Sequence, residues 1–143
     1  GCPTEDGFFY QSSSNQCFKY FGEERYNFNE AAERCESESL TLPHAYDAVG
    51  LRWYMLERYG NPTPAPWLNA IRVGNTTDFI WQDNNVIITS QNPLWIQGRP
   101  GNNNENCLIL AVNPRTISSQ PNRPYYNILC SLPSHLLCEF PLT

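Results

Sequence analysis

The chain has 143 residues, which is enough for one domain with its own hydrophobic core. Hydrophobic residues make up 41% and charged residues 16% of it, a balance typical of a globular domain and not of a disordered one. The net charge is -5 and the nine basic residues are scattered, so we exclude nucleic acid as a main partner. The longest apolar run, Cys107 to Val112, is far short of the roughly 20 residues that cross a bilayer, so we predict no membrane insertion of this segment.

The six cysteines indicate where the protein works. In a small acidic domain an even set of this size predicts three disulfides and an oxidising compartment, so we expect an extracellular protein, either secreted or the ectodomain of a membrane protein. A zinc site is the weaker interpretation, because no Cys-x-x-Cys pair exists and His44 and His135 lack ligand-like spacing. Spacing alone leaves the pairing open. The cysteines are Cys2, Cys17, Cys35, Cys107, Cys130 and Cys138.

Two short sequence features bear on processing. Asn75-Thr76-Thr77 is a glycosylation sequon, which is compatible with secretion. The chain starts at Gly1-Cys2-Pro3 with no signal peptide, so we expect a processed or excised segment.

The first part of the chain predicts a hairpin followed by a helix. Aromatic runs on either side of a polar turn predict a hairpin over Gly7–Phe21. Asn27 is a good helix N-cap, and Glu30 stands three residues later, as in a capping box. The apolar face that follows at helical spacing ends at Cys35, which therefore points inward.

A second helix is expected from about Ala45 to Tyr59. Its apolar stripe would consist of Ala45, Val49, Trp53 and Leu56. Gly60 then provides a C-terminal stop, and the prolines that follow enforce an extended exit.

From Trp67 onward the pattern predicts strands and one long loop. The continuous apolar run of residues 108–112 indicates a strand that is buried on both faces. The segment between Gln82 and Asn106 is rich in Asn, Pro and Gly, and a loop of this length in a compact domain is usually functional or disordered. The expected strands are 67–71, 79–81, 107–112, 126–130 and 136–140.

The order of these elements and of the cysteines resembles the long form of the C-type lectin-like domain. Trp67-Leu68-Asn69-Ala70 is similar to the family's Trp-Ile-Gly-Leu core motif, and Tyr26-Asn27-Phe28 is similar to its first-helix signature. Asn92-Pro93-Leu94-Trp95 resembles secreted invertebrate members most. The resemblance covers Cys2 to Phe140 and implies one domain over residues 1–143. The implied fold is α+β, with two helices flanking small antiparallel sheets and a long irregular ligand-binding loop.

The same resemblance implies the disulfide pairing. It pairs Cys2 with Cys17, Cys35 with Cys138 and Cys107 with Cys130. The second of these bridges would close nearly the whole domain and contribute about 5 kcal/mol in the chain-entropy model.

In sugar-binding members of this family a calcium ion is held by Glu-Pro-Asn or Gln-Pro-Asp in the loop, a Glu before a cysteine and an Asn-Asp pair on a later strand. Here the triplet is Arg99-Pro100-Gly101 and the pair is Tyr126-Asn127, while Glu105 is retained. Calcium requires six to eight oxygen ligands, most of them charged or carbonyl, and a guanidinium would repel the ion. We therefore expect no high-affinity calcium at this position and no other cofactor, although a shift in alignment along Asn102-Asn103-Asn104 could supply amide oxygens.

The candidate ligand-binding surface consists of Arg99, Asn103, Glu105, Tyr126 and Asn127. Structural interpretations compete with each assignment. Arg99 could form a salt bridge to Glu105 that rigidifies the loop in place of calcium. The tyrosines could pack, and the asparagine run could be a solvated turn. The four tryptophans are expected to be core or loop anchors.

Two functions of different kinds fit this sequence. The first is an extracellular recognition module that binds a carbohydrate or a microbial-surface glycan without the usual calcium bridge. The second is a protein-binding or structural domain of the same fold with a degenerate sugar site. Catalysis is not expected, because Ser131, Ser134 and His135 match no nucleophile motif and the carboxylates Glu36 and Glu38 show no shared cleft.

Overall fold

The structure, a computed structural model, describes residues 1–101 and 103–142. In chain order its elements are β1 (Phe8–Gln11), β2 (Gln16–Tyr26), α1 (Phe28–Glu36), α2 (Ala48–Tyr59), β3 (Trp67–Arg72), β4 (Phe79–Trp81), β5 (Ile87–Ile88), β6 (Cys107–Leu110), α3 (Pro114–Ser119), β7 (Tyr125–Ile128) and β8 (Ser134–Phe140). No helix in the described part of the chain is both long and apolar enough to cross a membrane.

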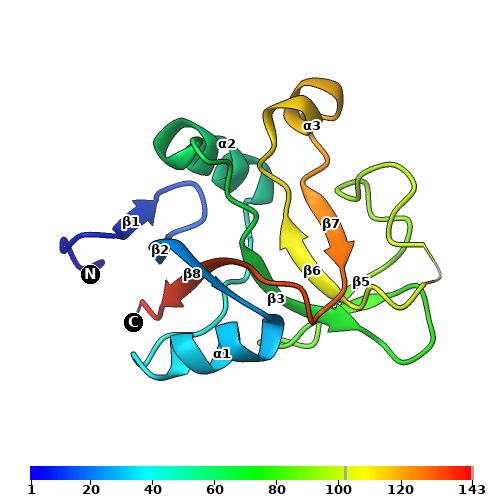
Figure 1. Cartoon of the computed structure of the whole chain (residues 1–143), viewed down its shortest axis with the longest axis horizontal. Helices are drawn as coiled ribbons and strands as arrows, with labels where there is room; N and C mark the ends of the chain where they lie inside the picture. Colours follow the sequence, from blue (N-terminus) through cyan, green and yellow to red (C-terminus); the bar gives the residue numbers. More distant parts are fainter. Residues whose placement is uncertain (102, 143) are drawn as a thin grey trace.

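The strands form two antiparallel sheets (Figure 1). The smaller sheet has the order β1-β2-β8 and brings the two termini to the same side of the molecule. The larger sheet has the order β5-β4-β3-β6-β7. The long connection between β5 and β6 lies at the end of the molecule opposite the termini. The sheets therefore hold this loop away from the ends of the chain.

The N-terminal half largely follows the sequence prediction. β1 and β2 form the predicted hairpin, although β2 continues to Tyr26. The capping box is present, since Glu30 N–H donates to Asn27 Oδ1 over 2.9 Å and Asn27 N–H donates to Glu30 Oε1 over 3.0 Å. Cys35 is fully buried on the inner face of α1.

All three predicted disulfides are present. The bridge between Cys35 and Cys138 spans 103 residues and joins α1 to β8. The bridge between Cys107 and Cys130 joins the start of β6 to the segment after β7. The bridge at Cys107 therefore fixes the end of the long loop that leads into β6.

The predicted face of the second helix is wrong. The helix begins at Ala48, where Asp47 is the N-cap, and not at Ala45. Its buried face consists of Ala48, Leu51, Arg52 and Met55. Trp53, which the expected stripe placed inward, is 42% exposed and is not a core anchor.

The buried Arg52 explains this error, because a charged residue does not mark an inner face in a hydrophobicity pattern. Its Nε donates to Ala111 O over 2.7 Å, and its two terminal nitrogens donate to Gln120 O over 2.7 Å and to Arg123 O over 2.9 Å. Burial lowers the pKa of Arg52 to about 10. These bonds attach α2 to α3 and its flanks, and α3 itself was not predicted.

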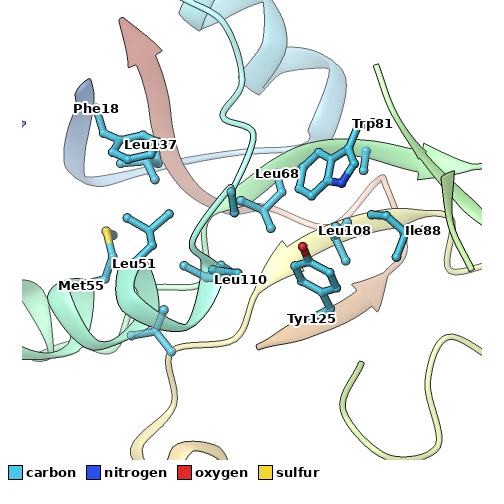
Figure 2. Close-up of a cluster of buried hydrophobic side chains, with 14 of the residues drawn as sticks. Phe18, Leu51, Met55, Leu68, Trp81, Ile88, Leu108, Leu110, Tyr125 and Leu137 are labelled. Carbon is cyan, nitrogen blue, oxygen red and sulfur yellow. The ribbon is translucent and has the colours of Figure 1, made fainter. Parts of the chain in front are cut away.

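The central strand β6 is buried on both faces, as its apolar run predicted. Leu108 and Leu110 face the cluster shared with α2, while Cys107 and Ile109 face the cluster shared with α1. This division follows from the alternation of side chains along a strand. Figure 2 shows the first cluster, in which Leu51 and Met55 of α2, Leu68 of β3, Trp81 of β4 and Tyr125 of β7 surround these leucines.

The bounds of the five predicted strands all agree with the structure to within two residues; β6, for example, ends at Leu110 and not at residue 112. One strand was missed, because the two-residue β5 at the sheet edge is too short for a sequence pattern. The predicted α+β class is unchanged by these differences in the strands. The structure also contains the short helix α3 besides the two helices that were expected.

Candidate functional site in the long loop

The first half of the long loop is attached to the edge of β7. Ile96 N–H donates to Tyr125 O and Tyr125 N–H donates to Leu94 O, each over 3.0 Å. Trp95 is only 1% exposed, and its indole N–H donates to Thr89 O over 2.9 Å. Trp95 is thus the loop anchor that the sequence predicted. Its burial fixes the segment that precedes Arg99.

Arg99 lies at the centre of the candidate site. One of its terminal nitrogens, Nη1, donates to Glu105 Oε1 over 2.8 Å and to Asn127 O over 2.9 Å. The other, Nη2, donates to the Tyr126 hydroxyl over 2.6 Å. The guanidinium therefore binds oxygen atoms of the loop and of β7 at the same time, as a metal ion does in a metal-bound loop.

Glu105 and Asn103 complete the exposed part of the site. Asn103 Nδ2 donates to Glu105 Oε1 over 3.0 Å, and Glu105 N–H donates back to Asn103 Oδ1 over the same distance. The Glu105 carboxylate is thus held from two sides, by a guanidinium and by an amide. Asn103 is exposed, and Arg99 and Glu105 are part-exposed, so all three remain accessible to a ligand.

Asn127 has a different place from the one the sequence suggested. It is fully buried, and its Nδ2 donates to Glu105 O over 2.7 Å and to Pro100 O over 2.9 Å. With no exposed surface it cannot touch a ligand in this conformation, and its contacts assign it to holding the loop against β7. The exposed or part-exposed residues of the candidate surface are therefore Arg99, Asn103, Glu105 and Tyr126.

Arg72, at the end of β3, is the residue that sequence reasoning missed. It is 8% exposed, and each of its five N–H donors is matched by a bond to an acceptor within the 72–77 turn or the loop. Burial lowers the pKa of Arg72, and the nearby Glu105 carboxylate opposes this shift. The acceptors are Asn106 Oδ1, Thr76 O, Gly101 O, Asn103 Oδ1 and Glu105 O.

A signal for Arg72 was present in the sequence. In β3 it has the same parity as Leu68 and Ala70, which are both buried, so alternation places its side chain on the inner face. A charge at an inward position requires partners, and the adjacent polar loop is the source of them. The two arginines meet through Asn103, which accepts from Arg72 and donates to Glu105.

These residues do not fit calcium. The Glu105 carboxylate, the Asn127 carbonyl and the Asn103 amide oxygen accept hydrogen bonds from cationic groups, so their lone pairs are directed at nitrogen donors. Within residues 1–101 and 103–142 no group of three or more His, Cys, Asp or Glu side chains could hold a metal ion. Asn102, which an alternative alignment would use, lies outside the described residues.

Two cavities are lined by residues of the site. Tyr126 lines a mainly apolar cavity of about 310 Å³ together with Ile96, Ile109 and Val112. Arg72 and Asn103 line a polar cavity of about 340 Å³, which also includes the sequon residue Asn75. Both volumes are at the lower end of the range for small-molecule sites, about 300–1,000 Å³.

Three of the residues considered for catalysis, Ser134, His135 and Glu38, make contacts that hold structural elements together. The hydroxyl of Ser134 donates to Ala65 O, and Nδ1 of His135 accepts from Ala65 N–H over 2.9 Å. Glu38 pairs with Lys19 over 2.7 Å and also with Arg34. These contacts connect β8 to the approach to β3 and connect α1 to β2, and they bring no nucleophile to a base.

Two antiparallel sheets, a long-range disulfide between the first helix and the last strand, and a long docked loop are the features of a C-type lectin-like fold. Residues 24–140 match the family described as the lectin C-type domain, and the chain belongs to this family. A comparison with curated proteins finds no match.

Solved structures confirm the fold at low sequence identity. The C-type lectin domain of murine dendritic cell inhibitory receptor 2, solved with an N-glycan, has a TM-score of 0.73 and 15% identity over 99% of this chain and 100% of that chain. The cow carbohydrate-recognition domain of CD23 has a TM-score of 0.69 and 18% identity over 100% and 99% of the two chains. A calcium-independent type II antifreeze protein has a TM-score of 0.69 and 13% identity over 98% and 94%.

Proposed function

We propose that this domain is an extracellular recognition module that binds carbohydrate, including glycans of microbial surfaces, through its long loop and without a calcium bridge. Its contact surface is formed by Arg99, Asn103, Glu105 and Tyr126. The observation that carries the proposal is the guanidinium of Arg99, which donates at once to a loop carboxylate and to the Tyr126 hydroxyl. The loop is thereby ordered by the protein itself.

The chemistry of this surface suits sugars. A hydroxyl group both donates and accepts hydrogen bonds, and the surface offers guanidinium donors, carboxylate acceptors and an amide with both capacities. Tyrosine adds an apolar ring with a polar tip, which suits the mixed character of a pyranose. Solved relatives of this fold include domains determined with an N-glycan and with an oligosaccharide, which supports the class of ligand.

The extracellular location is supported by three disulfides and by membership of the family. We propose binding as the whole of the activity and no catalysis, because the serine and histidine that could suggest a hydrolase serve to hold β8 against the chain before β3.

The test is a glycan array probed with the glycosylated, disulfide-intact domain, first in calcium and then in EDTA. Binding that survives EDTA is expected, with a loss of at least about tenfold in affinity for Glu105→Gln, because an amide cannot accept the charged hydrogen bonds of a carboxylate. The matched control is Glu57→Gln on the exposed face of α2, which should leave binding unchanged.

Two results would contradict the proposal in different ways. Binding that disappears in EDTA would show that calcium is held by another set of ligands. A blank array in both conditions would favour the alternative function, recognition of a protein or a structural role, with the same surface as the first place to search for a partner.

A further inference from the structure

The glycosylation sequon and the polar cavity beside the long loop belong to the same part of the surface. Asn75 lies in the exposed turn between β3 and β4, and it lines the 340 Å³ cavity together with Arg72, Asn103, Asn104 and Asn106. The sequon and the loop are far apart in sequence, so only the fold brings them together. A glycan attached to Asn75 would therefore start from a residue that lines this cavity.

The side chains that the modification requires are available. Asn75 is exposed, and among the described residues no hydrogen bond uses its amide or the hydroxyl of Thr77. Thr76 differs, because its hydroxyl donates to Val73 O over 2.6 Å and shapes the turn. The turn therefore presents the acceptor amide and the required hydroxyl together.

The cavity offers partners to an amino sugar. The donors of Arg72 are all used within the turn and the loop, so this residue acts as a wall and not as a ligand. Asn104 is exposed, and no hydrogen bond between described residues uses its side chain. Asn106 accepts from Arg72 through Oδ1, which leaves its Nδ2 directed elsewhere. Amide groups of this kind can pair with the acetamido and hydroxyl groups of N-acetylglucosamine.

We infer that Asn75 carries an N-linked glycan whose first N-acetylglucosamine lies in this cavity against Asn104 and Asn106. In the modification, Nδ2 of Asn75 forms a bond to the anomeric carbon of a lipid-linked diphospho-oligosaccharide. The bond from that carbon to the diphosphate breaks, the lipid diphosphate leaves with the electron pair, and one amide proton is released. The attached sugar then covers the flank of the loop that faces the turn.

This arrangement sets the direction from which an external ligand approaches. With the glycan over Asn104 and Asn106, the open side of the site is the one formed by Arg99, Glu105 and Tyr126. That consequence rests on the proposed function, whereas the occupancy of Asn75 and the position of its sugar do not.

The test uses the full chain secreted from a eukaryotic host, and neither of its measurements needs an external ligand. Intact mass before and after treatment with a peptide N-glycosidase reports the occupancy of Asn75. The glycan is then trimmed to a single N-acetylglucosamine, and amide hydrogen exchange is compared with the Thr77→Ala chain, which keeps Asn75 but has no sequon. We expect full occupancy and an exchange rate in residues 103–106 that is at least about fivefold slower in the trimmed glycoprotein.

Two further variants separate the sugar from the fold. Thr77→Ser keeps a hydroxyl at the sequon and should retain both the glycan and the protection. Asn104→Ala should retain the glycan but lose most of the protection. An unmodified Asn75, or a modified Asn75 with no change in exchange between residues 103 and 106, would overturn the inference, even if the domain binds glycans as proposed.

Discussion

Arg99 and Tyr126 are joined in two ways: the guanidinium carbon lies 4.0 Å from the centre of the tyrosine ring, and Nη2 of the arginine donates to the tyrosine hydroxyl over 2.6 Å. By the resemblance in sequence, both residues correspond to positions that hold oxygen ligands in calcium-binding members of the family. The two substitutions therefore compensate each other, because the Arg99 guanidinium interacts with the ring and the hydroxyl of Tyr126. Such a contact contributes about 1 kcal/mol where the pair is partly desolvated.

Replacing Arg99 should loosen the long loop. In Arg99→Ala the Glu105 carboxylate and the Asn127 carbonyl lose a charged donor, so we expect the free energy of unfolding to fall by about 2 kcal/mol. Urea denaturation, with the slope against denaturant unchanged, measures this loss. Arg99→Lys should recover less than half of it, because an ammonium lacks the planar fork. Arg115→Ala, at an exposed position on α3, is the control and should stay within about 0.5 kcal/mol of the parent.

A double change should create calcium dependence. Arg99→Glu with Gly101→Asn rebuilds a Glu-Pro-Asn triplet and adds a second carboxylate beside Glu105. Position 101 has a φ of 64°, a left-handed conformation that asparagine tolerates better than most residues. We expect calcium to raise the melting temperature of the variant but not of the parent, with a dissociation constant of about 1 mM, as in weak extracellular sites.

If calcium at concentrations well above that value has no effect on the double variant, the triplet alone does not explain the loss of the metal. The buried amide of Asn127, in place of a carboxylate, would then be the next position to change. A calcium response in the parent chain would contradict the interpretation of Arg99 as the substitute for the ion.

Arg52 should be among the most sensitive positions in the core. In Arg52→Met, the carbonyls of Ala111, Gln120 and Arg123 lose their donor, and we expect a loss of about 3 kcal/mol. Amide exchange should rise first in α3, because Arg52 supplies its attachment to α2. Arg58→Met, on an exposed face of the same helix, is the matched control. Equal losses in the two variants would show that helix propensity, and not the buried guanidinium, decides the result.

His135 should make the domain less stable in acid. Burial, with a smaller effect of Arg25, lowers the pKa of His135 from 6.5 to about 4. Between these values the unfolded chain binds the additional proton, so stability rises with pH across this window. The stability that the neutral form of His135 gives the folded state is complete above about pH 6.5. It is lost as the pH falls toward 4, a change in the free energy of unfolding of up to about 3 kcal/mol.

The measurement is the free energy of unfolding between pH 4 and pH 7 for the parent and for His135→Gln, whose side chain does not titrate. The difference between the two should shrink as the pH falls through that window. Burial also raises the pKa of Glu139, which acts in the opposite direction, but this carboxyl is present in both chains and cancels in the comparison. Parallel pH profiles would show that the pKa of His135 is not lowered in the folded state.

Local patterns were sufficient for much of the fold. The capping box at Asn27, the strand at Phe79–Trp81 and the two-sided burial of β6 depend on neighbours along the chain, and the sequence predicted each of them. The Asn-, Pro- and Gly-rich composition between Gln82 and Asn106 predicted the long loop. The disulfide pairing came from the resemblance to a family, since spacing alone left the cysteines unpaired. The structure brings the residues of the candidate site together in one cluster, but it buries Asn127, which the sequence placed on the binding surface.

Those roles depend on partners that are distant in sequence. Arg52 is an inner residue because carbonyl groups 59, 68 and 71 positions away accept its hydrogen bonds. Arg72 is buried because the loop provides acceptors 29 to 34 positions later. A buried charge is stable only where its donors are satisfied, and periodicity along the chain carries no information about acceptors from another segment. The sequence by itself therefore indicated the family and the segment that holds the candidate site, whereas only the tertiary structure decided which of its polar residues are exposed and which hold the loop.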